Sequence, residues 1–315
     1  MSGLFTWLVI RGVDAPVAFD ELRLANPAHY APAAVVLIVA IGIRALRWKV
    51  LLAPLGAVGA WSAFSALTIG YLANNALPAR LGEFVRVYVL NRETKTPAPA
   101  ILGTIILERV FDVLTLIGLL ALAALATGWN SPWNAPLIGL AIAAAAAFAI
   151  MYMVASGLIR SSMPGVSGLA QLMQRPFGGA LHRLIRSLIG GFRSVASGKA
   201  IAAILALSIV SWLVESLVYL LVLQALGIQE GGYWLAIVVT CISNLAGVIP
   251  AGPGNIGAFE FFVKETLVLF GVSDEKGLAF AIAAHFVVLI PPTVLGLLLV
   301  WKKGLATLGG GKPRL

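Results

Sequence analysis

Residues 101–116 read ILGTIILERVFDVLTL and place three charged side chains inside an apolar run that extends from residue 98 to residue 126. That run is longer than the roughly 20 residues needed to cross a bilayer. Glu108, Arg109 and Asp112 fall near its middle, where each charge costs about 2.5 to 3.5 kcal/mol and therefore pairs or faces a cavity. Their spacing predicts that Glu108 and Asp112 share one helix face and that Arg109 reaches Asp112. The stretch predicts a membrane helix with a polar site.

The rest of the chain supports the same fold class. Hydrophobic residues make up 60% of the 315 residues and charged residues only 11%, and the mean hydropathy is +0.97. Soluble globular domains do not have this balance. Further stretches long enough to span a bilayer occur at residues 33–52, 134–157, 201–226 and 278–301. The composition predicts an all-α, polytopic membrane helix bundle with about five full spans.

The net charge of +9 is first a topology signal, because Lys and Arg are retained on the cytoplasmic side of short loops. The uncharged connection at residues 128–136 contains two tryptophans and is expected to face outward. Placing the basic residues inside predicts a multi-pass bacterial inner-membrane protein with a cytoplasmic C-terminus and without a nucleic-acid partner. Four clusters hold 17 of the 22 basic residues: Arg44, Arg47 and Lys49; Arg80, Arg86, Arg92 and Lys95; Arg160, Arg175, Arg183, Arg186, Arg193 and Lys199; Lys302, Lys303, Lys312 and Arg314.

This charge distribution requires two segments to return to the side from which they enter. Residues 50–97 begin and end on the cytoplasmic side of the membrane, and residues 227–277 begin and end on the outer side. Each segment is therefore predicted to form a re-entrant helical hairpin, and the two hairpins enter from opposite faces. The helix breaks are expected at Pro78 in the first hairpin and at Pro250, Gly252 and Pro253 in the second.

The two hairpins also resemble each other in sequence. NNALPAR and AGVIPAG align with Pro78 on Pro250 at an offset of 172, and Glu83 falls on Glu260 at an offset of 177. Together with the opposite orientations, the match predicts an inverted repeat, as in many transporters. The predicted parts are an interfacial segment at 1–32, a single transmembrane domain at 33–301 and a basic cytoplasmic tail at 302–315. The transmembrane domain comprises repeat A at 33–126, a linking span at 134–157, a basic cytoplasmic amphipathic segment at 160–199 and repeat B at 201–301.

The helix breaks predict sites for an anion. A new helix exposes amide donors at a positive dipole end, and Gly254 and Asn255 are expected at such an end. The alternative is that these residues only form a tight turn. Glu83 and Arg86 are spaced to pair, which leaves Arg80 as a clamp for phosphate oxygens, or as an arginine that extends to lipid headgroups at the interface.

Other charged residues have candidate partners along the sequence. One arginine cannot neutralise both Glu108 and Asp112, and Arg80 and Arg86 are the nearest further cations. Glu260 and Lys264 are spaced i, i+4, whereas Glu215 and His285 are isolated in spans. His285 is expected to bond a neighbouring helix rather than to relay protons. A closed ion-pair network that only holds the bundle together remains an alternative for the buried charges.

Neither an enzyme nor a metal or cofactor site is expected. The three histidines and the single cysteine, Cys241, have no spacing suited to a metal or a nucleophile dyad. The chain also lacks a Walker-type phosphate loop, which argues against direct use of ATP.

Three motifs resemble the lysylphosphatidylglycerol synthase transmembrane family, also described as flippase-like membrane proteins. They are YLANNALPARLGEFVRVYVL at 71–90, ILERVFDVLTL at 106–116 and IPAGPGNIGAFE at 249–260, and the resemblance extends from about residue 33 to residue 301. In bifunctional members such a region is joined to a cytoplasmic aminoacyl-transferase domain and moves the aminoacylated lipid to the outer leaflet. That domain is not expected in this chain, and the N-terminus is shorter than the hydrophobic helix common in relatives. The family's polar motifs correspond to Arg80, Glu83, Arg86, Glu108, Arg109, Asp112 and the turn from Pro250 to Glu260.

The leading hypothesis is a lipid translocase of the cell envelope that holds an anionic headgroup, of a phospholipid or a polyprenyl phosphate, in a polar cavity near the membrane midplane. The resemblance leaves the cargo open, because stand-alone members often look like partners of envelope glycosyltransferases. The alternative is therefore a non-transporting membrane subunit that docks an envelope glycosyltransferase or a lipid-synthesis enzyme. A homo-oligomer is compatible with either function.

Overall fold

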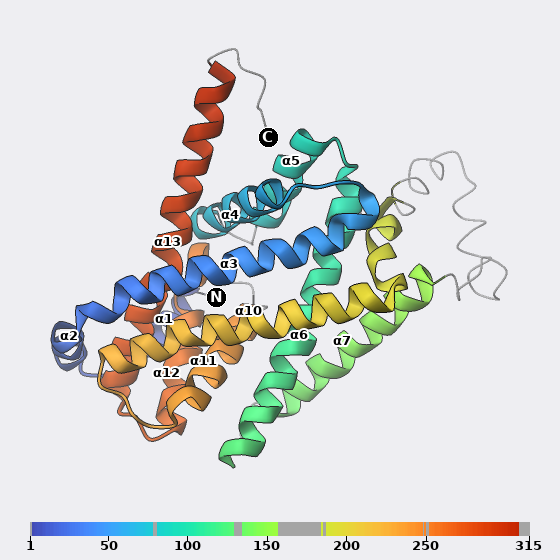
Figure 1. Cartoon of the computed structure of the whole chain (residues 1–315). Helices are drawn as coiled ribbons and strands as arrows, with labels where there is room; N and C mark the ends of the chain where they lie inside the picture. The colour runs from blue at the N-terminus through green and yellow to red at the C-terminus, as the bar shows by residue number, and fades with distance from the viewer. Residues whose placement is uncertain are drawn as a thin grey trace.

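The computed structural model describes residues 2–77, 81–128, 134–156, 184, 187–247, 249 and 252–308. Every regular element in these ranges is helical, and the helices form one bundle (Figure 1), which confirms the all-α membrane fold class. The principal helices are α1 (Ser2–Ile10), α2 (Ala15–Leu24), α3 (Tyr30–Leu52), α4 (Ala60–Ala76), α5 (Gly82–Thr94), α6 (Ala98–Thr127), α7 (Asn134–Ala155), α10 (Gly198–Ala225), α11 (Gly232–Ala246), α12 (Ala258–Leu269) and α13 (Asp274–Leu308).

Four helices in the described part of the chain, α6, α7, α10 and α13, are long and apolar enough to cross a membrane, judged by length and composition. They correspond to four of the five predicted spans. The remaining stretch, residues 33–52, lies in α3, whose 23 residues match the length of a span but carry Arg44, Arg47 and Lys49 in the second half. The apolar runs therefore predicted where the long helices form.

The segments predicted as hairpins are each two short helices separated by a break. α4 and α5 have 17 and 13 residues, and α11 and α12 have 15 and 12, all fewer than the roughly 20 residues of a typical span. Two glycines bring α4 and α5 together, because a Cβ atom added to Gly82 would lie 2.1 Å from the carbonyl oxygen of Gly70. The side chain of Asn74 then accepts a hydrogen bond of 2.8 Å from the Gly82 amide and closes the turn.

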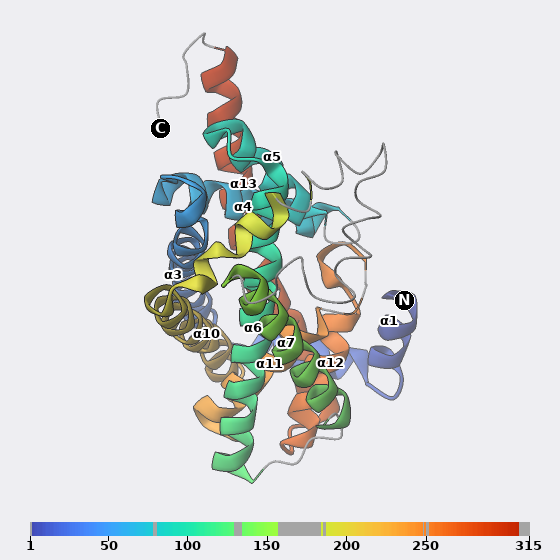
Figure 2. The ribbon, with the colours of Figure 1, turned by 90° about the vertical axis from the view of Figure 1, so that its right-hand side faces the viewer.

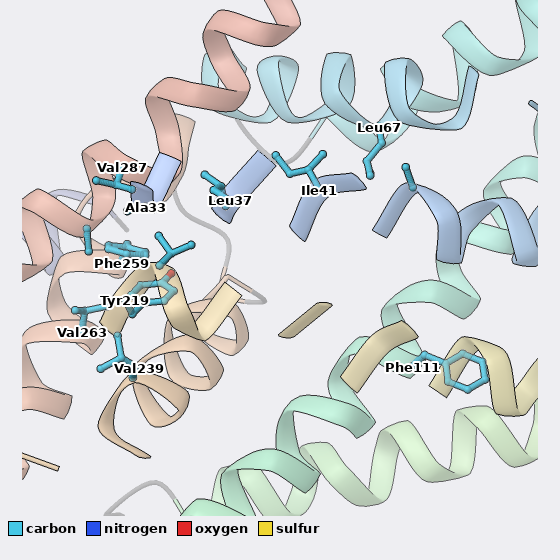
Figure 3. Close-up of a cluster of buried hydrophobic side chains, with 14 of the residues drawn as sticks. Ala33, Leu37, Ile41, Leu67, Phe111, Tyr219, Val239, Phe259, Val263 and Val287 are labelled. Carbon is cyan, nitrogen blue, oxygen red and sulfur yellow. The ribbon is translucent and has the colours of Figure 1, made fainter. Parts of the chain in front are cut away.

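The helices of the two halves of the chain, α3 to α6 before the linking span and α10 to α13 after it, share a hydrophobic core. α3 and α10 run side by side in opposite directions (Figure 1), and the Asn26 amide donates to the Ala225 carbonyl at 2.7 Å, which joins the start of one helix to the end of the other. The core contains residues from α3, α4, α6 and α10 to α13 (Figure 3). Burial of apolar side chains in this cluster therefore packs the two halves against each other.

A second structural link between the halves involves the proline pair in α13. Pro291 and Pro292 lack the amide donors that would continue the helical hydrogen bonds. The Asn75 side chain, at the end of α4, donates to the carbonyl oxygen of Leu289 at 3.3 Å and to the Thr293 hydroxyl at 2.8 Å. The break of the first hairpin is therefore attached to the weakened part of α13.

The N-terminal segment contains two short helices. Within the predicted interfacial segment at 1–32, the helix α2 (Ala15–Leu24) begins directly after Asp14, whose carboxylate caps it by accepting the Val17 amide at 3.4 Å. α1 lies beside α12 (Figure 2), with the Phe5 ring 5.5 Å from that of Phe261. The segment therefore packs on the second half of the bundle.

Most of the predicted amphipathic segment at 160–199 lies outside the described residues. Its end forms the 3₁₀ helix η4 (Gly191–Ala196), in which Phe192 and Val195 are buried. A Cβ atom on Gly191 would lie 2.4 Å from the Ala100 carbonyl oxygen, so the glycine allows η4 to pack directly on α6. Arg193 and Ala196 are exposed, so η4 has one buried and one exposed face, and the predicted amphipathic surface segment stays a prediction.

Candidate functional site

A cavity of about 380 Å³ lies between the helices of both halves. Both hairpin breaks reach it, the first through Leu77 and the second through Gly252, Gly254 and Asn255. Most of the remaining wall is polar or charged: Arg44, Arg47, Tyr71, Asn74, Asn75, Glu83, Glu108, Arg109, Asp112 and Asn244. The structure therefore brings the charged motif of α6 to the place where the two broken segments meet.

Glu108 lies at the centre of the charged wall and is buried. Its two carboxylate oxygens accept Nη1 and Nη2 of Arg86 at 3.1 and 2.5 Å, a two-pronged contact that favours arginine over lysine. The Arg86 guanidinium lies 3.5 Å from the ring centre of Trp48, whose Nε1 donates to the Thr104 hydroxyl at 3.0 Å. Arg86 is therefore the cation from the hairpin that Glu108 was predicted to require.

Asp112 binds two arginines from different helices. Arg47 Nη1 lies 2.5 Å from one carboxylate oxygen and Arg109 Nη1 lies 3.3 Å from the other. The second contact confirms the predicted pair at i, i+3. Arg109 also contacts Glu108 at 3.1 Å and Glu83 at 3.5 Å, so it bridges three carboxylates.

The first hairpin contributes a weaker pair. Glu83 lies 3.9 Å from Arg86, which confirms that the two residues are neighbours, although the principal partner of Arg86 is Glu108. Arg80 and Pro78 lie outside the described residues, as does Pro250, so the predictions made for these three stay predictions.

Arg44 and Glu215 form a further ion pair between α3 and α10, and both side chains are buried. The Arg44 guanidinium lies 4.1 Å from the ring centre of Trp212 and donates to the Tyr71 hydroxyl at 3.4 Å. Glu215 also accepts the Asn244 amide at 3.0 Å. The expectation that Glu215 is isolated is wrong, because its partner is on a helix distant in sequence.

The ion pairs correct the use of three arginines as topology signals. Arg44, Arg47 and Arg86 are only 8%, 0% and 2% exposed, and each pairs with a buried carboxylate. Arginines that anchor a span normally extend to the interface. These three are instead part of the interior charge network.

This charge network contains equal numbers of cations and anions, yet some of its donors are unused. Four arginines, at 44, 47, 86 and 109, face four carboxylates, at 83, 108, 112 and 215. Within the described part of the chain, five buried nitrogens of these arginines have no hydrogen-bond partner: Nε of Arg44, Arg47, Arg86 and Arg109, and Nη2 of Arg47, although this Nη2 lies 3.5 Å from a Glu108 carboxylate oxygen. A buried donor without a partner is costly. The network is therefore electrically balanced, and part of its hydrogen-bonding capacity has no partner among the described residues.

The second hairpin differs from its predicted geometry. Gly254 and Asn255 belong to a short turn (Pro253–Asn255) and both have left-handed backbone angles, with φ of 63° and 62°, so they are not the first residues of a helix. α12 begins at Ala258, and the Glu260 side chain accepts the Gly257 amide at 2.7 Å. The predicted amide site at Gly254 and Asn255 is wrong, because the side chain of Glu260 caps the helix that follows.

Two further side-chain pairs in this region differ from the pair that the i, i+4 spacing predicted. Glu260 contacts His285 rather than Lys264, and Lys264 contacts Asp274 at 2.7 Å and Glu265 at 3.1 Å. His285 bonds α12 and the hairpin break, as expected for a membrane histidine that contacts a neighbouring helix. The loop before α13 brings Asp274 within reach of Lys264, which i, i+4 spacing alone could not reveal.

Six of the nine predicted headgroup residues line the cavity, namely Glu83, Glu108, Arg109, Asp112, Gly254 and Asn255. Arg86 and Glu260 do not line this cavity: Arg86 contacts Glu108, and Glu260 contacts His285. The sequence interpretation missed Arg44, Arg47, Tyr71, Glu215 and Asn244 as parts of the site. The rule that drew attention to Glu108, that charges in a span require partners, applies equally to Arg44 and Glu215.

Among the residues that the structure describes, no group of three or more His, Cys, Asp or Glu side chains is arranged to hold a metal ion. The polar groups of the cavity are instead arginine donors, carboxylates and amides.

The long apolar helices and the buried charge network define a polytopic helical membrane protein with an internal polar cavity. The chain belongs to the family described as the lysylphosphatidylglycerol synthase TM region, whose model matches residues 1–296.

Two curated relatives cover most of the chain. It is 28% identical over 304 residues to the glycosyltransferase AglD of Haloferax volcanii, an alignment that covers 87% of this chain but 49% of AglD. It is 24% identical over 287 residues to a UPF0104 membrane protein of Methanothermobacter thermautotrophicus, with 85% of this chain and 83% of that protein covered. The chain thus spans about half the length of AglD and most of the second relative. No solved structure matches it significantly.

Proposed function

We propose that the chain is a lipid translocase that holds an anionic headgroup, such as a phospholipid or polyprenyl phosphate, in the cavity during its passage across the membrane. The observation that carries this proposal is that three arginines, Arg44, Arg47 and Arg109, line the cavity at the two helix breaks, and that each has a buried Nε without a hydrogen-bond partner among the described residues. Phosphate oxygens accept several hydrogen bonds at once and match the planar arginine fork.

The electrical balance of the network suits transient binding. The four carboxylates keep the arginines in place and neutralise them when the cavity holds no ligand. A phosphate in the cavity would meet Arg44, Arg47 and Arg109 in its wall, with these carboxylates holding the guanidinium groups in place. The volume of about 380 Å³ is within the range of about 300 to 1,000 Å³ typical of small-ligand sites, which is sufficient for a headgroup but not for its acyl chains.

We also propose that α4–α5 and α11–α12 are re-entrant hairpins and that they are equivalent parts of an inverted repeat. Support comes from the antiparallel arrangement of α3 and α10 and from the pairing of Arg44 with Glu215, which are 171 residues apart. That separation is close to the offset of 172 between Pro78 and Pro250. Equivalent residues of two inverted repeats meet near the axis that relates them.

We place the protein in the plasma membrane with its basic tail on the cytoplasmic side. Because Arg44, Arg47 and Arg86 are interior residues, the argument for orientation now depends on the basic residues at 160–199 and 302–314. These two segments alone still carry 10 of the 22 basic residues, which is sufficient to orient the spans by the positive-inside rule.

Reconstitution with paired variants tests the function. Vesicles would contain a fluorescent phosphatidylglycerol or a labelled polyprenyl phosphate, and the rate of label transfer between leaflets would be measured. Arg47→Gln removes a guanidinium from the cavity wall but also leaves Asp112 without its closest cation. The double variant Arg47→Gln with Asp112→Asn restores the electrical balance, and Arg92→Gln, on an exposed position of α5, is the matched control.

Headgroup binding predicts that the double variant is folded but transports at least tenfold more slowly, whereas Arg92→Gln transports at the wild-type rate. A network that only stabilises the bundle predicts normal transport by the double variant. That outcome, or an absence of transport by the wild type across both lipid classes, would overturn the proposal.

A second candidate function is supported by the match to AglD, a protein named as a glycosyltransferase that is about twice as long as the matched region. In this alternative the chain is a membrane subunit that works with an envelope glycosyltransferase or lipid-synthesis enzyme. Stable co-purification with such an enzyme, together with normal transport by the cavity variants, would favour it. In both candidate functions this chain binds and positions lipid or protein and catalyses no reaction.

A further inference from the structure

A smaller cavity of about 180 Å³ adjoins the first and shares Arg44, Tyr71 and Asn244 with it. His285 of α13 lines this cavity with only 6% of its surface exposed. Its ring is stacked on Phe259, with the ring centres 4.3 Å apart and the planes tilted by 22°. The imidazole is therefore fixed in orientation, and each of its two nitrogens faces a definite partner.

Both of those partners are acceptors. Nε2 lies 2.8 Å from the carbonyl oxygen of Gly254, which can only accept, so Nε2 carries a hydrogen. Nδ1 contacts a carboxyl oxygen of Glu260, whose other oxygen accepts the Gly257 amide at 2.7 Å. A neutral imidazole has a single N–H, so it cannot also donate to a Glu260 carboxylate. The contacts are satisfied only if His285 and Glu260 together hold one further proton, on Nδ1 or on the carboxyl.

We infer that His285 and Glu260 form a buried proton-binding site that fixes the turn of the second hairpin. The proton completes a chain from Gly254 through His285 and Glu260 to Gly257. Loss of the proton to water in the cavity leaves a neutral imidazole beside a carboxylate, so either the contact with Gly254 or the contact with Glu260 is broken. If the contact with Gly254 breaks, the turn Pro253–Asn255 loses its bond to α13; if the contact with Glu260 breaks, the start of α12 loses it.

The surroundings contain no described charge that would replace this proton. Arg44 and Glu215 line the smaller cavity but neutralise each other, and Tyr71 and Tyr219 are its other titratable groups. Lys264 of α12 is paired with Asp274 and Glu265. The charged residues of α2, namely Asp20, Glu21 and Arg23, do not line the cavity. The neighbouring residues 248, 250 and 251 are Val, Pro and Ala, which do not titrate.

Hydrogen exchange of the full-length protein in detergent, measured by mass spectrometry from pH 5 to pH 9 and corrected for the intrinsic rate, tests the site without any lipid assay. Residues 252–257 are expected to exchange about tenfold faster after deprotonation, the factor that corresponds to loss of one buried hydrogen bond. Residues 191–200 contain no His, Asp or Glu and serve as the internal reference.

Glu260→Gln is the decisive variant. Its side-chain amide can donate to Nδ1 and its oxygen can accept the Gly257 amide, so all the contacts form without the extra proton. We expect slow exchange that no longer depends on pH. His285→Gln cannot bridge both partners and should exchange fast at every pH. An unchanged pH response in Glu260→Gln, or no response in the wild type, would overturn the inference.

A direct measurement locates the proton. With ¹⁵N-labelled histidine, nuclear magnetic resonance distinguishes His285 from His29 and His182 by comparison with His285→Gln. At neutral pH we expect either a doubly protonated ring or a neutral ring beside a protonated carboxyl, the latter seen as an infrared band that is absent in Glu260→Gln. A neutral ring beside an ionised Glu260 would contradict the inference. Use of this proton in headgroup movement depends on the proposed function, whereas these measurements do not.

Discussion

Arg44 and Glu215 are 171 residues apart in the chain and form a buried ion pair between α3 and α10. The pair joins the first half of the bundle to the second beside the cavity. Removing one partner leaves an uncompensated charge in the interior, whereas removing both leaves no unpaired charge, although Tyr71 and Asn244 then each lose a hydrogen-bond partner. The two halves are therefore coupled by a contact whose energetic role can be measured.

Arg44→Met or Glu215→Leu alone is expected to lower the free energy of unfolding by about 3 to 5 kcal/mol, because each leaves a buried charge without its partner. The double variant should recover most of that loss. Equilibrium unfolding in detergent, analysed as a double-mutant cycle, measures the coupling. Losses that simply add in the double variant would show that the two side chains do not interact.

Arg86→Lys is expected to destabilise the protein although the charge is retained. Lysine cannot bind both oxygens of Glu108 and cannot stack its head on Trp48 as the planar guanidinium does. We expect a loss of about 1 to 3 kcal/mol in the same unfolding measurement. The matched control is Arg92→Lys at an exposed position of the same helix, which should change stability by less than about 0.5 kcal/mol.

Gly82→Ala should disrupt the first hairpin. Its Cβ atom would lie 2.1 Å from the Gly70 carbonyl oxygen, which is backbone and cannot move without separating α4 from α5. Poor yield of monodisperse protein and faster proteolysis are the expected results. Gly118→Ala is the control, because that exposed helical position has open space around it, and alanine there should be neutral or stabilising by up to about 1 kcal/mol. Equal behaviour of the two variants would contradict the close approach of the helices.

Asn75→Ala should weaken the attachment of the first hairpin to α13. The amide donates to the Leu289 carbonyl and the Thr293 hydroxyl near two prolines that already interrupt the helix. We expect a loss of about 1 to 3 kcal/mol and faster hydrogen exchange after Pro292. Thr293→Val removes only one of the two acceptors and should have the smaller effect. Equal exchange in all three proteins would show that Asn75 does not stabilise this part of α13.

The sequence alone determined the helix content, the positions of the long helices and the interruption of two segments. These properties depend on local patterns: apolar runs of span length predicted α6, α7, α10 and α13, and prolines and glycines predicted the breaks between α4 and α5 and between α11 and α12. The pair of Arg109 with Asp112 was also predictable, because residues three positions apart share a helix face.

Only the tertiary structure decided which charges on different helices meet. Arg44, Arg47 and Arg86 have the sequence pattern of residues at a cytoplasmic end, and their interior position depends on carboxylates supplied by other helices. Glu260 contacts His285 across two helices rather than Lys264 one turn away, because Gly257 starts α12 beside α13. Spacing along one helix defines a face, but the partner of that face depends on how the helices pack, and in a bilayer the cost of an unpaired charge makes that packing decisive.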